Sequence, residues 1–406
     1  MAKKVEDIRN IAVVGHGSAG KTTLVDRLLV KTGTVNANPS VDDGTSICDF
    51  DDEEKHHKYS IEASVTHLEH RGKHFNLIDC PGYPDLIGQT IGALRGVDNA
   101  LIVIDAHSGI KVNTRRVWNE AGKAGVGRII AISKLDTDNI DFPGLIDSIK
   151  EVFGNQCVLV NVPIGQGDSL SGVASTLQVP DDTSGCLVDP GEISETLVES
   201  IIESDEELME KYFEGEVPSL DQLGKLMVQA IVEGTLTPIL CFSTKADVGV
   251  DELIDFLATS SVPPDAITRT GKQGDAEVQI TADASGPLVA QVFKTRIDPF
   301  VQKLSFIRVF SGSMKKDDHV EASTARKGLK LSQPLRMQAG HTENADVASA
   351  GDIVAVAKTE ELHTGTSIGE VTLPPIEFPR PMVGLAVTPK SRGDETKLSG
   401  ALHKIV

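Results

Sequence analysis

The hydrophobic residues of this chain follow one rhythm up to about residue 258 and a different one after it. In the first part, continuously apolar runs alternate with segments of helical periodicity, as buried parallel strands alternate with helices. The apolar runs lie at residues 11–14, 100–104, 129–132 and 238–242. Apolar residues at positions 24, 25, 28 and 29 have helical spacing, and Gly33 closes that segment. This alternation predicts a doubly wound α/β sheet.

Two further patterns predict antiparallel structure. Residues 61–65 alternate between apolar and polar, and an Arg-Gly pair at 71–72 leads into residues 74–78, which predicts a hairpin at the sheet edge. Residues 259–287 are rich in Ser, Pro, Gly, Thr and Asp and have little apolar periodicity, which is typical of a linker. After them, short apolar runs at 288–293, 304–310 and 353–357 are separated by turn residues and predict an all-β barrel.

The net charge of −20 restricts the expected partners. Residues 137–270 hold 5 Lys and Arg against 25 Asp and Glu, whereas the parts before and after are nearly neutral. Because binding to phosphate backbones depends on Lys and Arg, we do not expect this chain to bind nucleic acid by general electrostatics. The charge therefore predicts no DNA partner, and contact with RNA only locally or through proteins.

The apolar and cysteine content predicts a cytoplasmic protein without membrane contact. No apolar run approaches the ~20 residues that cross a bilayer, and the first ten residues lack the apolar stretch of a signal peptide. The five cysteines are scattered and never form C-x-x-C. We interpret them as reduced structural thiols and not as metal ligands.

Residues 15–22, GHGSAGKT, match the phosphate-binding pattern G-x-x-x-x-G-K-[ST]. The match follows a predicted strand and opens a predicted helix, so that backbone N–H groups and the helix dipole can hold phosphates. Lys21 would place its charge on the β- and γ-phosphates, and the Thr22 hydroxyl would bind Mg²⁺. The predicted nucleotide-binding residues here are Gly15, His16, Gly17, Ser18, Ala19, Gly20, Lys21, Thr22 and Thr23.

Three more motifs follow predicted strands at their carboxyl ends, where ligands bind in open α/β sheets. Residues 79–82, DCPG, place a carboxylate near the expected Mg²⁺ and a glycine N–H near the γ-phosphate, which is typical of a switch loop. In residues 133–136, SKLD, the last carboxylate can accept two hydrogen bonds from the guanine edge, which adenine cannot donate. With residues 243–245, STK, these motifs predict a guanine-nucleotide site that includes Asp79, Gly82, Ser133, Lys134, Asp136, Ser243, Thr244 and Lys245.

In this order the four motifs resemble those of translational GTPases, and the resemblance to the elongation factor G family extends over almost the whole chain. Residues 298–300, 305–312 and 335–337 resemble the second domain of that family. The 106 residues between Asp136 and Ser243 leave room for the subdomain that this family inserts, and residues 162–165, VPIG, resemble its opening.

The resemblance implies a P-loop GTP-binding domain over residues 1–262 with an inserted subdomain at about 155–237. A linker at 263–284, a translation-factor β-barrel at 285–378 and the start of an incomplete α+β third domain at 379–406 would follow. In that third domain we expect a strand at residues 381–387 and a helix at 394–406. Because about 28 residues cannot bury a stable core, we expect a fragment of a longer protein or a truncated paralogue.

The resemblance also implies a function, namely a GTP-hydrolysing translation factor that acts on the ribosome in elongation and translocation. Its ligands would be GTP or GDP and Mg²⁺, and its partners the ribosomal stalk protein and ribosomal RNA. We expect a monomer. Release factor three and the tetracycline ribosomal protection proteins are related families. The second- and third-domain segments of this chain resemble elongation factor G more than they resemble either of these.

Several residues depart from the pattern of this family. Tyr83 stands where the family has the histidine that orients the attacking water, and Ser60 stands at the switch threonine, so that Thr22, Ser60 and Asp79 are the predicted metal ligands. Ser133 lacks the amide that helps to bind the base and brace the phosphate loop, and Ser18 replaces an aspartate.

Tyr83 leaves two function classes open. Because phosphoryl transfer depends mainly on positioning and electrostatics, we expect ribosome-stimulated hydrolysis with Tyr83, Lys21 and Gly82 as catalytic residues. A phenol is nevertheless a poor base at pH 7. The alternative is a ribosome-associated paralogue that binds guanine nucleotides with little or no hydrolysis.

The acidic residues 192–216 have apolar positions at helical spacing and predict one amphipathic helix from Glu192 to about Tyr212. Glu195, Glu199, Glu203 and Glu206 would form a stripe along it. Such a stripe could steer a basic patch of the stalk protein, or it could be an ordinary solvated face.

Overall fold

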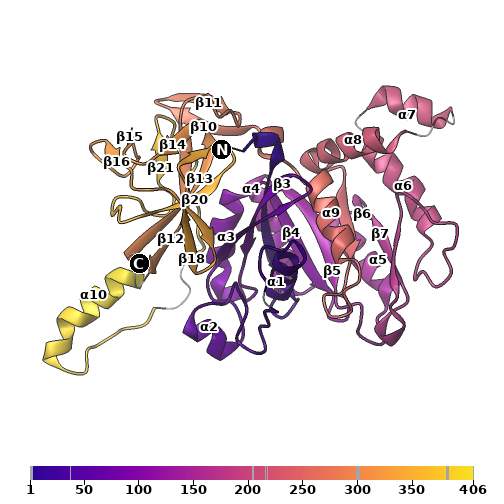
Figure 1. Cartoon of the computed structure of the whole chain (residues 1–406), viewed down its shortest axis with the longest axis horizontal. Helices are drawn as coiled ribbons and strands as arrows, with labels where there is room; N and C mark the ends of the chain where they lie inside the picture. The colour runs from indigo at the N-terminus through magenta and orange to yellow at the C-terminus, as the bar shows by residue number, and fades with distance from the viewer. Residues whose placement is uncertain are drawn as a thin grey trace.

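The computed structural model describes residues 3–36, 38–203, 205–214, 216, 218–298, 302–380 and 384–405. An α/β unit and an antiparallel β unit lie side by side, and a C-terminal helix extends away from both (Figure 1). No helix among these residues has the length and apolar character needed to cross a membrane. All five cysteines are free.

A seven-stranded sheet forms the centre of the α/β unit and confirms the predicted doubly wound fold. Its strand order is β2-β3-β1-β4-β5-β9-β6, and only the β2–β3 pair is antiparallel. The strands are β1 (Ile8–Gly15), β2 (Ser64–His70), β3 (Lys73–Asp79), β4 (Asn99–Asp105), β5 (Gly127–Ser133), β6 (Cys157–Leu159) and β9 (Thr237–Cys241). The four predicted buried runs lie in β1, β4, β5 and β9, and the predicted hairpin is β2–β3 at the sheet edge.

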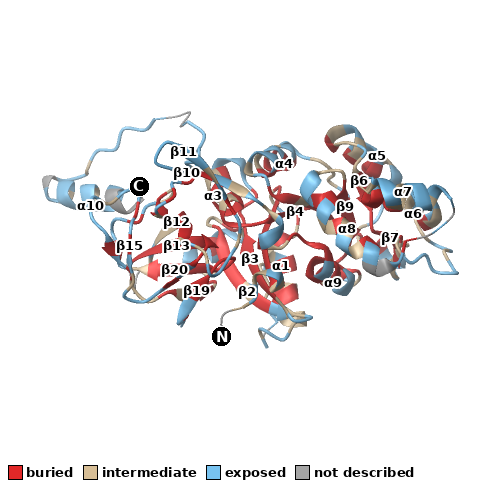
Figure 2. Cartoon of the chain, turned by 90° about the horizontal axis from the view of Figure 1, so that it is seen from above, coloured by how far each residue is buried: buried red, intermediate tan, exposed pale blue. Residues whose placement is uncertain are grey.

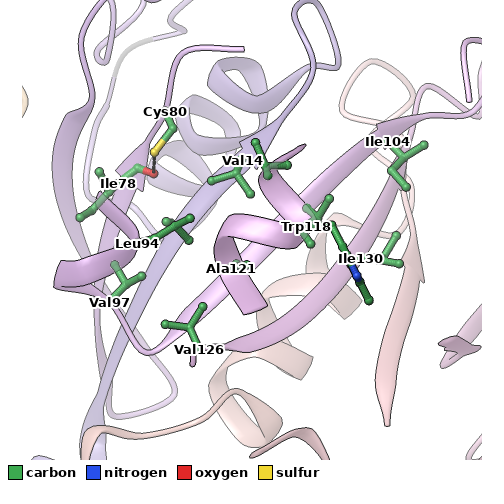
Figure 3. Packing of buried hydrophobic residues seen from close by; sticks show 14 of the residues in the cluster. Val14, Ile78, Cys80, Leu94, Val97, Ile104, Trp118, Ala121, Val126 and Ile130 are labelled. Carbon is green, nitrogen blue, oxygen red and sulfur yellow. Dashed lines mark hydrogen bonds between the residues drawn. The ribbon is translucent and has the colours of Figure 1, made fainter. Parts of the chain in front are cut away.

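Helices cover both faces of this sheet. Ala12 and Val14 of β1 point into one core, whereas Ile11 and Val13 point into the other. Figure 3 shows the first core, where Trp118 lies over the sheet near Ile104 and Ile130. The helices of the α/β unit outside the insert are α1 (Lys21–Lys31), α2 (Asp52–His57), α3 (Ile87–Gly96), α4 (Val112–Ala124), α5 (Phe142–Phe153) and α9 (Val250–Ser260).

The inserted segment contributes β6 to the main sheet and adds a small hairpin and three helices. These elements are β7 (Asn161–Ile164), β8 (Gly172–Ser175), α6 (Pro190–Ile202), α7 (Glu206–Phe213) and α8 (Leu220–Glu233). The prediction of one helix from Glu192 to Tyr212 is wrong, because Asp205 starts a new helix by accepting a hydrogen bond from the Leu208 N–H at 3.0 Å. Glu206 therefore lies on α7 and does not continue the predicted acidic stripe of Glu195, Glu199 and Glu203.

The expected linker at 263–284 contains a β-hairpin, which corrects the sequence interpretation. Strands β10 (Arg269–Gln273) and β11 (Ala276–Ile280) pair around a turn at Gly274, where φ is +61°. Ile280 packs in a small apolar cluster with Val289 and Phe310 of the β unit. Most other residues of the hairpin are exposed. The hairpin therefore lacks the alternation of apolar and polar residues from which a strand is predicted.

The β unit confirms the predicted all-β architecture, with a six-stranded antiparallel sheet in the order β18-β17-β20-β13-β12-β21. Its strands are β12 (Val289–Asp298), β13 (Gln302–Ser311), β17 (Leu335–Gln338), β18 (His341–Asn344), β20 (Ile353–Ala357) and β21 (Ser367–Gly369). Two small strand pairs flank it, β14 (Ser313–Lys315) with β19 (Val347–Ser349) and β15 (His319–Val320) with β16 (Leu329–Lys330). Alternate residues of β12 and β13, such as Val292 and Ile307, share one apolar core.

A buried ion pair joins the two units. Arg308 on β13 donates to both carboxylate oxygens of Asp98, at 2.9 and 3.1 Å, and to the Gly96 carbonyl at 3.1 Å. Asp98 also accepts hydrogen bonds from Asn10 of β1 and Arg269 of β10. Burial alone would raise the pKa of Asp98, but the charges of Arg308 and Arg269 hold it below its ordinary value.

The C-terminal segment contains α10 (Glu395–Ile405), where a helix was predicted. It is largely exposed and projects from the body of the protein (Figure 2). The strand predicted at 381–387 is not formed by residues 384–387, and residues 381–383 lie outside the described part. A strand needs a neighbour for its backbone hydrogen bonds, and no described strand pairs with this segment.

Single turns of 3-10 helix complete the described elements. They are η1 (Val5–Asp7), η2 (Pro84–Leu86), η3 (Gly167–Ser169), η4 (Pro264–Ala266) and η5 (Arg392–Asp394). Of these, η2 directly follows Tyr83 and leads into α3, so it connects the predicted switch loop to the helix beside the β unit.

Candidate functional site

The phosphate loop connects β1 to the first turn of α1. Gly15 has φ +148°, and a Cβ atom there would overlap the Val103 carbonyl oxygen of the neighbouring strand β4. Gly20 has φ +88° and precedes the first residue of α1, while Ser18 is also left-handed at φ 62°. The Lys21 ammonium donates to the His16 carbonyl at 2.8 Å, inside the loop. The loop thus has the wrapped form that turns backbone N–H groups toward an anion.

The three predicted metal ligands lie together although they come from three different parts of the chain. The Thr22 hydroxyl donates to Asp79 Oδ2 at 2.7 Å, and Ser60 Oγ lies 3.0 Å from Thr22 Oγ1. Asp79 Oδ1 is buried and has no hydrogen-bond partner among the described residues. Two hydroxyls and an unsatisfied carboxylate oxygen are hard donors of the kind that Mg²⁺ prefers, so these residues fit that ion.

Asp49 is a further member of this cluster that the sequence analysis missed. Its side chain is buried, and neither carboxylate oxygen meets a donor at good hydrogen-bond geometry among the residues that the structure describes. The nearby Ser60 hydroxyl lies 3.4 Å from Asp79 Oδ2. Burial and the charge of Asp49 raise the pKa of Asp79 to about 7, against the opposing effect of Lys21. In the sequence Asp49 stands next to the acidic run at 51–54, where it looks like one more solvated carboxylate.

Gly82 of the predicted switch loop touches the phosphate loop directly. A Cβ atom on Gly82 would lie 2.5 Å from Lys21 Nζ and 2.6 Å from the Gly17 nitrogen. Asn113 of α4, which the sequence analysis also missed, donates to the Gly82 carbonyl at 2.8 Å and to the Gly15 carbonyl at 3.3 Å. Asn113 therefore bridges the two loops. The sequence analysis could not find it, because it lies in a helix outside the four motifs.

Tyr83 lies at the mouth of the site and is 41% exposed. A Cβ atom built on Gly17 would lie 3.5 Å from its ring, which therefore sits against the phosphate loop. The ring also packs against Tyr59 with 4.6 Å between centroids. This pair joins the segment that carries Ser60 to the segment that carries Gly82.

The predicted base-binding residues form a second cluster. Asp136 accepts a hydrogen bond from the Ser243 hydroxyl at 2.5 Å, and Lys245 Nζ lies 3.8 Å from its other oxygen. The Ser133 hydroxyl donates to the Ala19 carbonyl at 2.7 Å and so holds the phosphate loop in place. The expectation that Ser133, lacking an amide, no longer supports this loop is therefore wrong. Lys134 pairs with Asp105 at 2.9 Å.

A cavity of about 380 Å³ lies between the phosphate loop, residues 58–60 and the switch loop at residues 82–83. It is lined by Gly17, Ser18, Gly20, Lys21, Thr22, Thr23, Pro39, Ser40, Val41, Asp42, Asp49, Lys58, Tyr59, Ser60, Gly82, Tyr83 and Lys134. Of the predicted base-binding residues, only Lys134 reaches this lining; Thr244 is half-buried in the loop after β9. His16 lies beneath the loop, where burial and Lys21 lower its pKa to about 4.

A glycine-rich loop between the first strand and helix, with hydroxyl and carboxylate groups beside it, defines a P-loop nucleotide-binding domain. Residues 6–263 match the family model of the elongation factor Tu GTP binding domain, and the chain belongs to that family. Residues 287–371 match the model of elongation factor G domain 2, so the chain has the domain order of an elongation factor G-like translational GTPase.

Two relatives extend this likeness over most of the chain. Elongation factor G of Fervidobacterium nodosum is 32% identical over 423 aligned residues, which cover 98% of this chain and 61% of that protein. A crystal structure of a protein from Thermus thermophilus is 29% identical, with a TM-score of 0.84 over 98% of this chain and 60% of the other. This chain therefore spans about three-fifths of the length of both.

Proposed function

We propose that this chain binds GTP and GDP with Mg²⁺ and hydrolyses GTP as part of a translation factor that acts on the ribosome. The observation that carries the proposal is the meeting of Thr22, Ser60 and Asp79 beside the phosphate loop, in a chain of this family. Mg²⁺ would neutralise charge on the β- and γ-phosphates.

The chain's own residues would act mainly by positioning. Lys21, which now donates to the His16 carbonyl, would turn to the phosphates, and the Gly82 N–H would meet the γ-phosphate. The Tyr83 hydroxyl can hold a water molecule, and its ring is steadied by Tyr59. Phosphate release measured with and without ribosomes tests this proposal. Stimulated turnover supports it, nucleotide binding without turnover supports the paralogue alternative, and no binding contradicts both.

Base selection is expected to depend on Asp136. We expect calorimetry in Mg²⁺ buffer to give micromolar binding of GTP and GDP and at least tenfold weaker binding of ATP, since adenine cannot donate to this carboxylate. Asp136→Asn should shift the preference toward xanthine nucleotides, whose C2 carbonyl accepts from the amide. Asp138→Asn, two residues further along, is the control. Equal affinity for ATP and GTP in the unchanged chain would contradict the guanine assignment.

The inserted segment is proposed to meet a cationic partner, the ribosomal stalk protein by family resemblance. Glu195, Glu199 and Glu203 are exposed at intervals of four residues along α6 and its C-terminal cap. Reversing Glu199 and Glu203 to lysine should slow association with ribosomes several-fold at low salt and have little effect at high salt, because such charges act on encounter and are screened.

A matched reversal of Glu277 and Glu343 on the β side of the chain is the control for net charge. Stopped-flow association at two ionic strengths measures both variants. If both pairs slow association equally, the stripe is an ordinary solvated face.

A further inference from the structure

Lys58 has a backbone conformation that a lysine seldom adopts. It follows α2 as the capping residue, with φ 58° and ψ 38°, and its N–H donates to the Glu54 carbonyl at 2.7 Å. This left-handed cap position favours glycine, because a Cβ atom is strained there. A strained residue of this kind at the wall of a site is a reason to ask what its side chain does.

Lys58 is an exposed residue at the wall of the nucleotide cavity. Two other lysines line the same cavity, and both have partners: Lys21 donates to the His16 carbonyl, and Lys134 pairs with Asp105. Within the part of the chain that the structure describes, Lys58 makes no side-chain hydrogen bond or ion pair. Of the three described lysines at the cavity wall, Lys58 is therefore the one whose ammonium has no partner to give up when an anion binds.

The neighbours of Lys58 in the chain belong to the side of the cavity where the predicted metal ligands lie. Tyr59 packs on Tyr83, and the Ser60 hydroxyl is in the cluster with Thr22. The buried Glu54 carboxylate accepts from the Ile61 N–H at 3.0 Å and from the Glu62 N–H at 3.1 Å, which fixes the chain beyond Ser60. The segment is thus held on both sides of Lys58.

We propose that Lys58 binds the terminal phosphate of GTP and so favours the triphosphate over the diphosphate. The inference rests on the proposed guanine-nucleotide binding. GDP lacks the γ-phosphate oxygens on which the ammonium would act, whereas Lys21 and the loop N–H groups serve both nucleotides. An added cation also offsets Asp42 and Asp49, the two carboxylates of the cavity wall, which would repel a triphosphate.

Lys58→Gly is the informative variant, because glycine adopts the left-handed cap without strain and the variant should fold at least as well. We expect calorimetry with a non-hydrolysable GTP analogue and with GDP, both in Mg²⁺ buffer, to show about tenfold weaker binding of the analogue. GDP affinity should change less than about twofold. Lys58→Arg should restore most of the preference, because it returns the charge.

Lys55→Ala is the matched control, since it removes a lysine from α2 that is exposed but does not line the cavity. It should leave both affinities unchanged. If the unchanged chain binds neither nucleotide, the proposed function fails. If that chain binds both and Lys58→Gly keeps the same ratio of GTP-analogue to GDP affinity, or lowers both equally, the assignment of Lys58 is overturned.

Discussion

Arg308→Ala is expected to lower the free energy of unfolding by about 3–5 kcal/mol, because it leaves a buried carboxylate without its main partner. Arg308 is 1% exposed and Asp98 is fully buried, so water cannot replace the lost hydrogen bonds. Arg269 stays 3.0 Å from Asp98 and compensates only part of the loss. The units that meet at this ion pair should therefore loosen together.

Urea denaturation followed by circular dichroism measures this effect. The control is Arg326→Ala on an exposed loop of the β unit, for which we expect a change below about 0.5 kcal/mol.

Because Arg308 and Arg269 hold the pKa of Asp98 below its ordinary value, the pair stabilises the fold above the unfolded pKa of about 4. This stabilisation is lost as the pH falls through the lower folded pKa. A loss below about 1 kcal/mol at pH 7 would show that the pair does not hold the units together.

Asp79→Asn is expected to stabilise the nucleotide-free chain at pH 8 while it removes Mg²⁺-dependent nucleotide binding. Burial and Asp49 raise the pKa of Asp79 to about 7 in the folded chain, against about 4 when unfolded. The protonated carboxyl is thus favoured by folding, and its stabilisation is present at low pH and lost as the pH rises through about 7. Between pH 5 and pH 8 the corresponding loss of folding free energy is about 3 kcal/mol, since the folded carboxyl is ionised above about pH 7.

Chemical denaturation at pH 5 and pH 8, without nucleotide, tests the sign of this effect. Between the two pH values the unchanged chain should lose stability relative to Asp79→Asn, because only the unchanged chain carries this carboxyl. Asp85→Asn, which removes an exposed carboxylate after the same loop, should follow the unchanged chain. GDP with Mg²⁺ should stabilise the unchanged chain at pH 8 but not Asp79→Asn, since only bound ligand shifts the equilibrium. Equal pH dependence in both would contradict the assigned role of burial.

Local patterns were enough to predict the elements that build the site. A continuous apolar run predicts a buried strand, and a glycine-rich motif after it predicts a phosphate loop, because both depend on residues adjacent in the chain. The strand ends then place Asp79, Ser133 and Asp136 at one edge of the sheet, as the parallel topology requires. The left-handed turn at residues 71–72 was equally local, with φ values of 47° and 74°.

Contacts between distant residues were decided only by the tertiary structure. Three residues of the site look like ordinary polar residues in the sequence, namely Asp49, Lys58 and Asn113. Each reaches the site only because distant parts of the chain fold together. The pairing of Arg308 with Asp98 joins positions 210 residues apart, and no periodicity encodes it. The hairpin at 269–280 lacks an apolar face, and the break before α7 depends on one capping aspartate. The sequence determines structure locally through hydrophobic pattern and turn chemistry, whereas burial, charge pairing and pKa depend on which surfaces meet.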